Sequence, residues 1–390
     1  MSIDTVDFKN IRVLVLEGYT RQSLPIIYSL RKLGCHVSAL CGSKLDVAYV
    51  SRKTSNKILG VCDRTDPDGT AEQVRKLLKS GKFDVVIPTA DFSAKLLSDN
   101  LEEFKKYAKI MSNTKEVYGI AGDKVETMRV CMENDIPCPK TLLGITDIDE
   151  VLDSDIAYPI VVKPRVGYGA IGFKKISSRE KLEELFKDGE HNPSEYVFQE
   201  YIPQTGLQYE CAMFVDNENE VKTSLVFSKN RWFPVDGGSS TLNITVERPD
   251  IVESCTKLLK LINWRGPADI DLIQDERDGK AKIMEINPRV SGSVKIAFVS
   301  GVDQARQMIE LLYGKNVTKY EKYKIGQRLR CSQTDLLWFL KSKDRFSSKP
   351  SWFSLKNTKD QIFSLSDPLP WFAFSLSGVL KYRKEMEKRK

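Results

Sequence analysis

The sequence is poor in histidine. His36 and His191 are the only histidines in 390 residues, so a zinc site built on histidine and a Ser-His-Asp triad are both nearly excluded. The eight cysteines are scattered and form no C-x-x-C pair. With no recognisable signal peptide, this pattern predicts reduced thiols and a cytoplasmic protein. Any chemistry must therefore rest on carboxylates, Lys, Arg and a bound metal ion.

The sequence also lacks a dinucleotide-binding glycine motif, an apolar run long enough to span a bilayer, and a strong positive charge along most of its length. Residues 17–20 (EGYT), after the first apolar run, do not form G-x-G-x-x-G, which disfavours a dinucleotide-dependent oxidoreductase. The apolar run at 371–380 is too short to span a bilayer. The net charge is +7, of which residues 381–390 carry +4. The remainder is close to neutral and predicts no nucleic-acid groove.

The composition, 41% hydrophobic and 29% charged, is that of a soluble globular protein with two or three domains. An apolar run at 11–16, a helical pattern at 22–33 and a strand pattern at 36–40 predict the opening βαβ unit of a doubly wound sheet. A helix is expected at 70–80, a third strand at 83–88 and another helix at 100–108. Asp91 follows that third strand, where it either caps a helix, the preferred interpretation, or contacts substrate.

Residues 266–292 hold the most informative pattern. Residues 268–273 (ADIDLI) alternate like a half-buried strand, Asp278-Gly279 favours a tight turn, and residues 281–286 return antiparallel. This hairpin would project Asp271 and Glu285 from one face, with Asn287 beside them. Two carboxylates and an amide are hard oxygen ligands that suit a magnesium ion holding phosphates.

Residues 284–292 (MEINPRVSG) resemble the metal-binding signature of the ATP-grasp superfamily, and are especially similar to one unit of the carbamoyl-phosphate synthetase large subunit. That family makes acyl phosphates from ATP and a carboxylate, then passes the acyl group to a nucleophile. The resemblance implies Mg²⁺, with Mn²⁺ as an alternative, on Asp271, Glu285 and Asn287. It gives Arg289 a catalytic role beside the transferred phosphoryl group or the tetrahedral intermediate.

A strand at 160–164 (IVVKP) ends in a Lys and runs into a glycine-rich loop at 167–172 (GYGAIG). A Lys beside backbone N–H groups freed by glycines predicts an ATP phosphate lid. Its candidate residues are Lys163, Gly167, Gly169 and Gly172. The resemblance adds Lys124, whose counterpart in the family reaches the nucleotide phosphates.

A strand at 196–203 corresponds to the segment that holds adenine in the resembling family. The resemblance places the adenine contacts on backbone groups at Glu200 and Ile202. Gln208 stands where the family has a ribose-binding Glu, and Glu210 lies two residues further on the same face. Which of these two side chains holds the ribose is left open.

For each of two later segments, two interpretations remain open. Residues 233–241 are either an acceptor-substrate loop, with Arg231 the likeliest partner for a carboxylate, or a plain connection. The C-terminal part is expected to hold a strand at 325–330 and a helix at 334–340. Its end (371–390) is either a helix packed on the core or on another subunit, or an interfacial segment on an anionic membrane.

The expected fold is α/β and α+β multidomain. We expect a pre-ATP-grasp domain at 1–112, an ATP-grasp small lobe at 113–192, a large lobe with the metal site at 193–318, and a basic C-terminal extension at 319–390. The expected function is an ATP- and Mg-dependent ligase joining a small-molecule carboxylate to an amine, in a monomer or homodimer. The alternatives are a carboxylase or carbamoyl-phosphate-type enzyme using bicarbonate, and a non-catalytic, membrane-associated ATP-binding protein.

Overall fold

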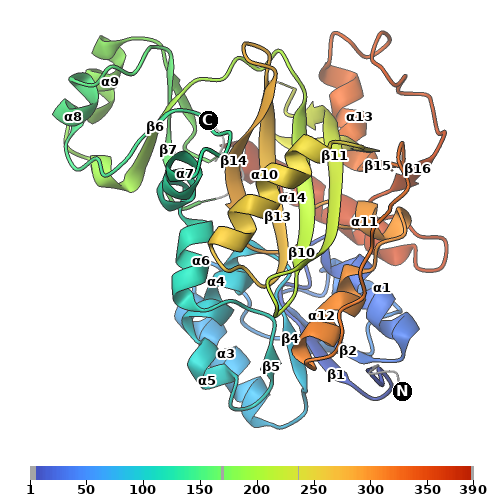
Figure 1. Cartoon of the computed structure of the whole chain (residues 1–390). Coiled ribbons are helices and arrows are strands. Elements are labelled where there is room, and N and C mark those ends of the chain that lie inside the picture. Colours follow the sequence, from blue (N-terminus) through green and yellow to red (C-terminus); the bar gives the residue numbers. More distant parts are fainter. Residues whose placement is uncertain (1–5, 168–170, 236, 388–390) are drawn as a thin grey trace.

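The computed structural model describes residues 6–167, 171–235 and 237–387. Figure 1 shows a small lobe standing apart from a larger body, in which a long twisted sheet sits above the N-terminal region. Three sheets organise these described residues. The α/β and α+β multidomain fold expected from the sequence is confirmed. The four domain limits given above remain predictions.

The N-terminal sheet is parallel and has the order β3-β2-β1-β4-β5. Its strands are β1 (Arg12–Val15), β2 (His36–Cys41), β3 (Asn56–Leu59), β4 (Val85–Ile87) and β5 (Lys109–Ile110). The helices are α1 (Ser23–Leu33), α2 (Val47–Val50), α3 (Pro67–Lys79), α4 (Asp91–Asp99) and α5 (Leu101–Phe104). Two expectations are wrong. The strand at 83–88 is the fourth, because the edge strand β3 went unrecognised, and the helix expected over 100–108 stops at Phe104.

The small lobe is an antiparallel sheet of order β6-β9-β7-β8. Its strands are β6 (Thr141–Leu142), β7 (Ile160–Pro164), β8 (Lys174–Ile176) and β9 (Tyr196–Glu200). Helices α8 (Ile148–Leu152) and α9 (Arg179–Phe186) cover the sheet, while α6 (Lys115–Gly122) and α7 (Lys124–Glu133) join the lobe to the body. Phe198 and Leu182 lie in its own small core.

The large sheet has the order β14-β13-β10-β11-β12-β15-β16. Its strands are β10 (Gln208–Val215), β11 (Val221–Phe233), β12 (Ser239–Val246), β13 (Gly266–Asp275), β14 (Lys280–Asn287), β15 (Arg328–Arg330) and β16 (Thr358–Asp360). The helices of this half are α10 (Pro249–Leu261), α11 (Lys295–Val299), α12 (Gln304–Leu312), α13 (Ser332–Lys341) and α14 (Leu369–Glu387). The C-terminal part of the chain therefore extends the sheet that carries the predicted metal hairpin.

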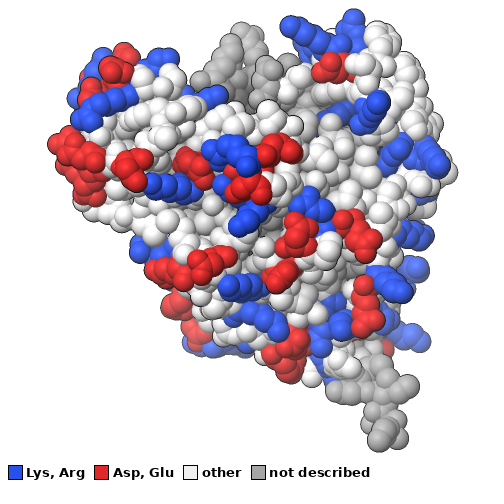
Figure 2. Space-filling view, turned by 45° about the horizontal axis from the view of Figure 1, so that its top comes forward, with Lys and Arg blue, Asp and Glu red and all other residues white. Residues whose placement is uncertain are grey.

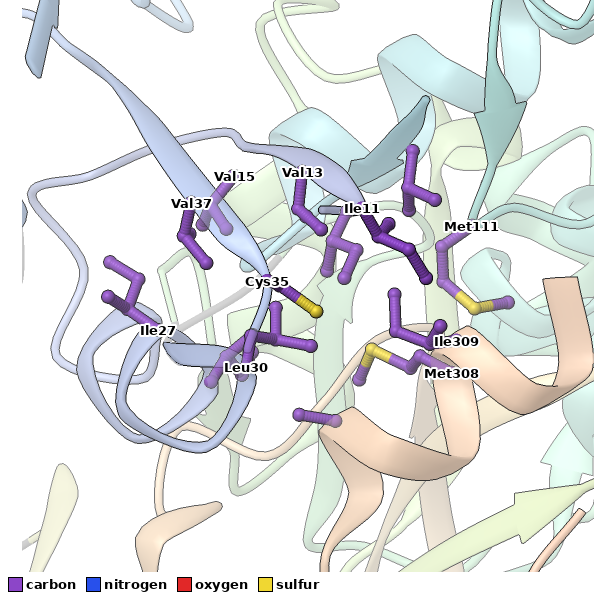
Figure 3. Packing of buried hydrophobic residues seen from close by; sticks show 14 of the residues in the cluster. Ile11, Val13, Val15, Ile27, Leu30, Cys35, Val37, Met111, Met308 and Ile309 are labelled. Atoms are coloured by element: carbon purple, nitrogen blue, oxygen red, sulfur yellow. The ribbon is translucent and has the colours of Figure 1, made fainter. Parts of the chain in front are cut away.

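A shared core joins the N-terminal sheet to the large lobe. Met308 and Ile309 of α12 pack against Val13, Val37 and Leu30 from β1, β2 and α1 (Figure 3). Burying large apolar side chains between elements far apart in sequence stabilises their relative placement. The strand ends of the N-terminal sheet are thus held beside the end of β14.

The C-terminal part is also anchored on the N-terminal region. Ile362 packs with Leu24 and Val47, and Trp371 lies against this cluster. The fully buried Asp367 accepts hydrogen bonds from the hydroxyls of Tyr28 (3.0 Å) and Ser51 (2.5 Å). Within residues 6–167, 171–235 and 237–387, no helix is long and apolar enough to cross a membrane.

Candidate functional site

Strand pairing brings carboxylates from three strands into one row. In the β13–β14 hairpin Asp271 lies opposite Glu285, and Asp269 lies opposite Asn287. On the other side of β13, Asp271 lies opposite Glu210 of β10. Residues opposite each other point to the same face of a sheet. The single-face placement of Asp271 and Glu285 expected from the alternation is therefore present.

A lysine that the sequence analysis did not single out lies in this row. Lys229 of β11 contacts Asp271 at 2.5 Å and Glu210 at 2.9 Å. Burial alone would lower the pKa of Lys229, but the two carboxylates outweigh burial and raise it. The same lysine is the main reason that the pKa of Asp271 is lowered despite burial. Lys229 thus offsets the mutual repulsion of two carboxylates in a partly buried place.

Lys124 joins the hairpin to the glycine-rich loop. Its ammonium group donates to the carbonyl of Gly167 at 2.8 Å and lies 3.2 Å from the Glu285 carboxylate. Lys163, at the end of β7, belongs to the same cluster. Burial lowers the pKa of Lys163 to about 8, an effect that the nearby Glu285 opposes. Two lysines and a hairpin carboxylate from three separate segments therefore meet at the loop.

The structure describes part of the glycine-rich loop at 167–172. Gly167 has φ 151° and Gly172 has φ 78°, values at which a side chain would be strained. Gly169 lies outside the described residues.

Arg289 lies where the hairpin meets the N-terminal sheet, in contact with Asp269 of β13 and Asp91 of α4. Its guanidinium donates to Asn287 Oδ1 at 2.8 Å and lies 3.6 Å from Asp269 and 3.1 Å from Asp91. The preferred interpretation of Asp91 as a helix cap is wrong, because Ala90 is the N-cap of α4. Burial would lower the pKa of Arg289, but Asp91 and Asp269 raise it. Arg289 is therefore charged and held in place from two domains.

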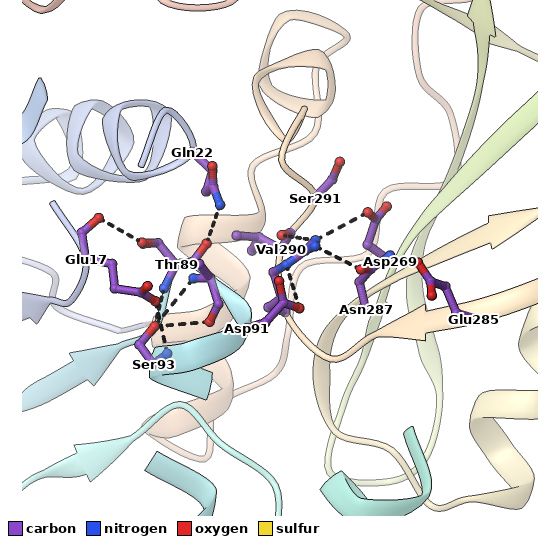
Figure 4. A network of polar contacts seen from close by, with 12 residues as sticks. Glu17, Gln22, Thr89, Asp91, Ser93, Asp269, Glu285, Asn287, Val290 and Ser291 are labelled. Carbon is purple, nitrogen blue, oxygen red and sulfur yellow. Dashed lines mark hydrogen bonds and ion pairs between the residues drawn. The ribbon is translucent and has the colours of Figure 1, made fainter. Parts of the chain in front are cut away.

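A buried carboxylate fixes the start of α4 and so the direction of Asp91. Glu17 accepts hydrogen bonds from the Ser93 amide (3.0 Å) and the Tyr19 hydroxyl (2.8 Å). Burial raises the pKa of Glu17. Figure 4 shows Glu17 and Ser93 on one side of Asp91, and Asp269 and Asn287 on the other.

Asp269 is the second residue that sequence reasoning passed over. It is almost fully buried, and its Oδ1 has no hydrogen-bond partner among the described residues. Burial, and then the carboxylates of Glu210 and Asp271, raise its pKa well above the ordinary value. The Asp-x-Asp spacing of β13 was the available signal, since both residues must then lie on one face.

The remaining predicted nucleotide contacts lie along β9 and β10. The Glu200 amide bonds the Lys140 carbonyl (2.8 Å) and its carboxylate contacts Arg277 (2.9 Å), while the Ile202 side chain is buried. Both Glu210 oxygens are bonded, one by Lys229 and the other by Ser291 at 2.7 Å. Of the two ribose candidates, Gln208 is the freer, with one long contact to Gln204.

The expected acceptor role of Arg231 is wrong. Arg231 is buried and bonds both oxygens of the fully buried Asp335 at 2.9 and 3.1 Å. It meets a carboxylate, but one supplied by α13 of its own chain. The connection between β11 and β12 comprises residues 234–238 and is thus shorter than the segment 233–241 expected from the sequence. Residue 236 lies outside the described residues.

The donor set suits a magnesium ion that also binds phosphate. Asp271 and Glu285 face one another with about a fifth to a quarter of each side chain exposed, and Mg²⁺ takes one or two carboxylates together with substrate phosphates and water. No cluster of three or more His, Cys, Asp and Glu side chains suited to a metal occurs in the described part of the chain. Asn287 turns its oxygen to Arg289 and its amide to Asp271, so its place as a metal ligand stays a prediction.

Comparison with known proteins identifies the domain that carries this site. Residues 121–293 match the family described as ATP-grasp domain. The biotin carboxylase domain of the Hydrogenobacter thermophilus 2-oxoglutarate carboxylase has a similar fold, with a TM-score of 0.69 and 17% identity over 82% of this chain and 74% of that one. The chain thus contains an ATP-grasp domain, preceded by a parallel sheet domain.

Two curated relatives share sequence with this chain. A D-aspartate ligase of Enterococcus faecium is 27% identical over 60% of this chain and 59% of its own length. A carbamoyl phosphate synthase large chain of Clostridium acetobutylicum is 23% identical over 70% of this chain and 24% of its own length. The chain therefore spans about three fifths of the first relative and a quarter of the second.

Proposed function

We propose that this chain is an ATP- and magnesium-dependent ligase that activates a substrate carboxylate as an acyl phosphate and joins it to an amine. The observation that carries the proposal is the double contact of Lys124, to Gly167 in the glycine-rich loop and to Glu285 in the hairpin. A loop suited to phosphate and a carboxylate pair suited to Mg²⁺ thereby form one site.

In the proposed reaction a substrate carboxylate oxygen attacks the γ-phosphorus of ATP, and ADP leaves. The amine nitrogen then attacks the acyl carbon, phosphate departs, and the nitrogen loses a proton. A Mg²⁺ ion held by Asp271 and Glu285 would offset the charge of the phosphate groups. Lys124 and Lys163 supply cations for the triphosphate, and Asp271 and Glu285 hold the metal.

Arg289 supplies a fixed positive charge in this reaction. The contacts to Asp91 and Asp269 hold its guanidinium at the end of β14. A donor that is already oriented stabilises charge developing on a transferred phosphoryl group or an oxyanion without reorganising. No nucleophilic side chain is required.

The sequence likeness to a D-aspartate ligase favours an amino acid as one substrate. The chain also resembles in fold a biotin carboxylase domain whose structure is a dimer and contains MgADP and bicarbonate. We therefore retain bicarbonate as an alternative substrate and a homodimer as an alternative assembly. Contact of the basic tail with an anionic membrane also remains a prediction, and residues 388–390 of that tail lie outside the described residues.

Phosphate release with ATP and Mg²⁺, across amino acids offered singly and in pairs and across bicarbonate, tests the proposal. We expect release to depend on an acid and an amine together, and to be abolished in Glu285→Ala and Arg289→Ala. Circular dichroism checks that each variant folds. Release that needs only bicarbonate would favour the carboxylase alternative, and undiminished release in a folded variant would contradict the mechanism.

A further inference from the structure

Exposed apolar side chains are concentrated in one part of the chain. Among the described residues, nine large apolar side chains are more than half exposed, and seven of them lie between residues 340 and 376. Monomeric soluble proteins rarely gather such side chains in one region without a binding role. We call the six most exposed the C-terminal apolar surface: Leu340, Phe346, Phe353, Leu355, Leu365 and Phe372.

Part of this surface is held in place by ring contacts. The ring of Phe339 on α13 lies 4.4 Å from that of Trp352 and 5.5 Å from that of Phe346, measured between centroids. The Trp352 indole donates to the Asp335 carbonyl at 3.2 Å, and the Arg330 guanidinium lies over its ring, 4.2 Å from the centroid. Residues 342–357 are therefore packed on α13 and still leave Phe346, Phe353 and Leu355 outside.

The second part of the surface is anchored by hydrogen bonds. The Trp371 indole donates to the Ser332 hydroxyl at 2.9 Å, and Gln333 bonds Ser375 at 3.1 Å. These contacts dock the beginning of α14 on α13 while Phe372 remains 58% exposed. Phe372 is thus exposed on a helix that is itself packed against α13.

Positive charge accompanies the apolar side chains. Between residues 340 and 376 six cations are exposed: Lys341, Lys343, Arg345, Lys349, Lys356 and Lys359. Of the three acids in that interval only Asp344 is exposed, since Asp360 bonds three backbone amides and Asp367 is buried. In Figure 2 blue outnumbers red along the right-hand edge, the side on which Figure 1 places α13, β15 and β16.

The whole C-terminal extension, residues 319–390, has an excess of positive charge. Residues 319–390 contain 17 Lys and Arg against 7 Asp and Glu, a net charge of +10, whereas the full chain has +7. The first 318 residues are therefore net negative. A surface in which Phe and Leu alternate with Lys and Arg matches the boundary between acyl chains and anionic headgroups, where rings insert shallowly and cations meet phosphate.

We propose that the C-terminal apolar surface docks this protein on an anionic lipid membrane, lying on the bilayer without spanning it. An acidic protein partner would use the cations but offers no apolar medium for the six exposed Phe and Leu side chains. A second copy of this chain would bring six like-charged groups against six others. An anionic lipid surface can contact both the exposed cations and the exposed apolar side chains.

Sedimentation of the full chain with vesicles tests the proposal. We expect binding to vesicles of phosphatidylcholine with about 30% phosphatidylglycerol, weak binding to phosphatidylcholine alone, and loss of binding as salt screens the charges. The triple variant Phe346→Ser, Phe353→Ser, Leu355→Ser should bind at least about tenfold more weakly. Lys343→Glu with Lys349→Glu should weaken binding to the anionic vesicles alone.

The control is a matched variant, Leu59→Ser with Leu261→Ser, which alters exposed apolar side chains elsewhere and should bind vesicles like the wild type. Absence of vesicle binding in the wild type, or equal binding by the triple variant, would overturn the proposal. Loss of a dimer in the triple variant, seen by analytical ultracentrifugation without vesicle binding, would assign the surface to a second copy instead. None of these outcomes depends on ligase activity.

Discussion

Lys229 reaches from β11 across β10 and bonds Asp271 on β13 at 2.5 Å, while also contacting Glu210 on the strand between them. A positive charge thus lies within the carboxylate row. Because Lys229 offsets charges that a metal would also offset, its loss should make the fold depend on the metal.

The first prediction follows from this contact. Lys229→Met leaves two partly buried carboxylates uncompensated, so the free energy of unfolding should fall by about 3 kcal/mol in EDTA. Millimolar Mg²⁺ should restore part of this loss, because the cation takes over the neutralising role. Urea unfolding with and without Mg²⁺ measures both effects. Lys260→Met removes an exposed pair with Glu220 and should cost less than about 1 kcal/mol under either condition.

The second prediction concerns pH. Burial lowers the pKa of Lys163 to about 8, against about 10.4 in an unfolded chain. Between these pH values the unfolded chain binds the proton and the folded chain does not, so this group makes the free energy of unfolding rise with pH from about 8 to about 10.4. A bound triphosphate favours the ammonium form, so ATP binding should take up a proton above pH 8.

Calorimetry of ATP binding in buffers of different ionisation enthalpy measures that uptake. Lys163→Arg is the control, because a guanidinium stays charged throughout this range. Equal uptake in the wild type and in Lys163→Arg would assign the proton to another group.

The third prediction tests the contact between the N-terminal domain and the site. Asp91→Asn removes the carboxylate beside Arg289 and should lower the rate of phosphate release about tenfold, because the guanidinium loses one of its two orienting charges. The KM for ATP should change little, because the substitution leaves Lys124 on Gly167 of the glycine-rich loop. Asp99→Asn, at the other end of α4 and paired with Lys95, should leave the rate within about twofold. An unchanged rate in Asp91→Asn would remove the N-terminal domain from catalysis.

The fourth prediction separates a structural arginine from a substrate-binding one. Arg231→Met leaves Arg330 as the remaining ion-pair partner of the buried Asp335, so the free energy of unfolding should fall by about 3 kcal/mol or more. The KM for each substrate should stay unchanged, because Arg231 is enclosed by α13. A raised KM for the acid with unchanged stability would return Arg231 to the acceptor site.

The sequence predicted the hairpin well because its information is local. Alternation over 268–273 and the Asp278-Gly279 turn specify a two-stranded unit, and the period of two then puts Asp271 and Glu285 on one face. The same reasoning failed for β3, where only Ile58 and Leu59 are apolar and the strand lies at an exposed edge. Hydrophobic alternation is a weak signal for a strand when few of its side chains are buried.

Contacts across long sequence separations were out of reach. The neighbours of Asp91 favour a helix cap, whereas its partner Arg289 is 198 residues away. The neighbours of Arg231 leave a substrate carboxylate open as its partner, because nothing nearby predicts the buried Asp335. Lys229 and Asp269 acquire their roles from the strand order β13-β10-β11, which pairs segments that are not consecutive in the chain.

The central claim is that a hairpin carboxylate holds a cation that in turn holds the triphosphate. Titration calorimetry of ATP in Mg²⁺ and in EDTA, on the wild type, Glu285→Gln and the exposed hairpin control Glu276→Gln, tests it most directly. We predict that Mg²⁺ tightens ATP binding at least about tenfold in the wild type and in Glu276→Gln, and has little effect in Glu285→Gln. Full magnesium-dependent ATP binding by Glu285→Gln would contradict the account.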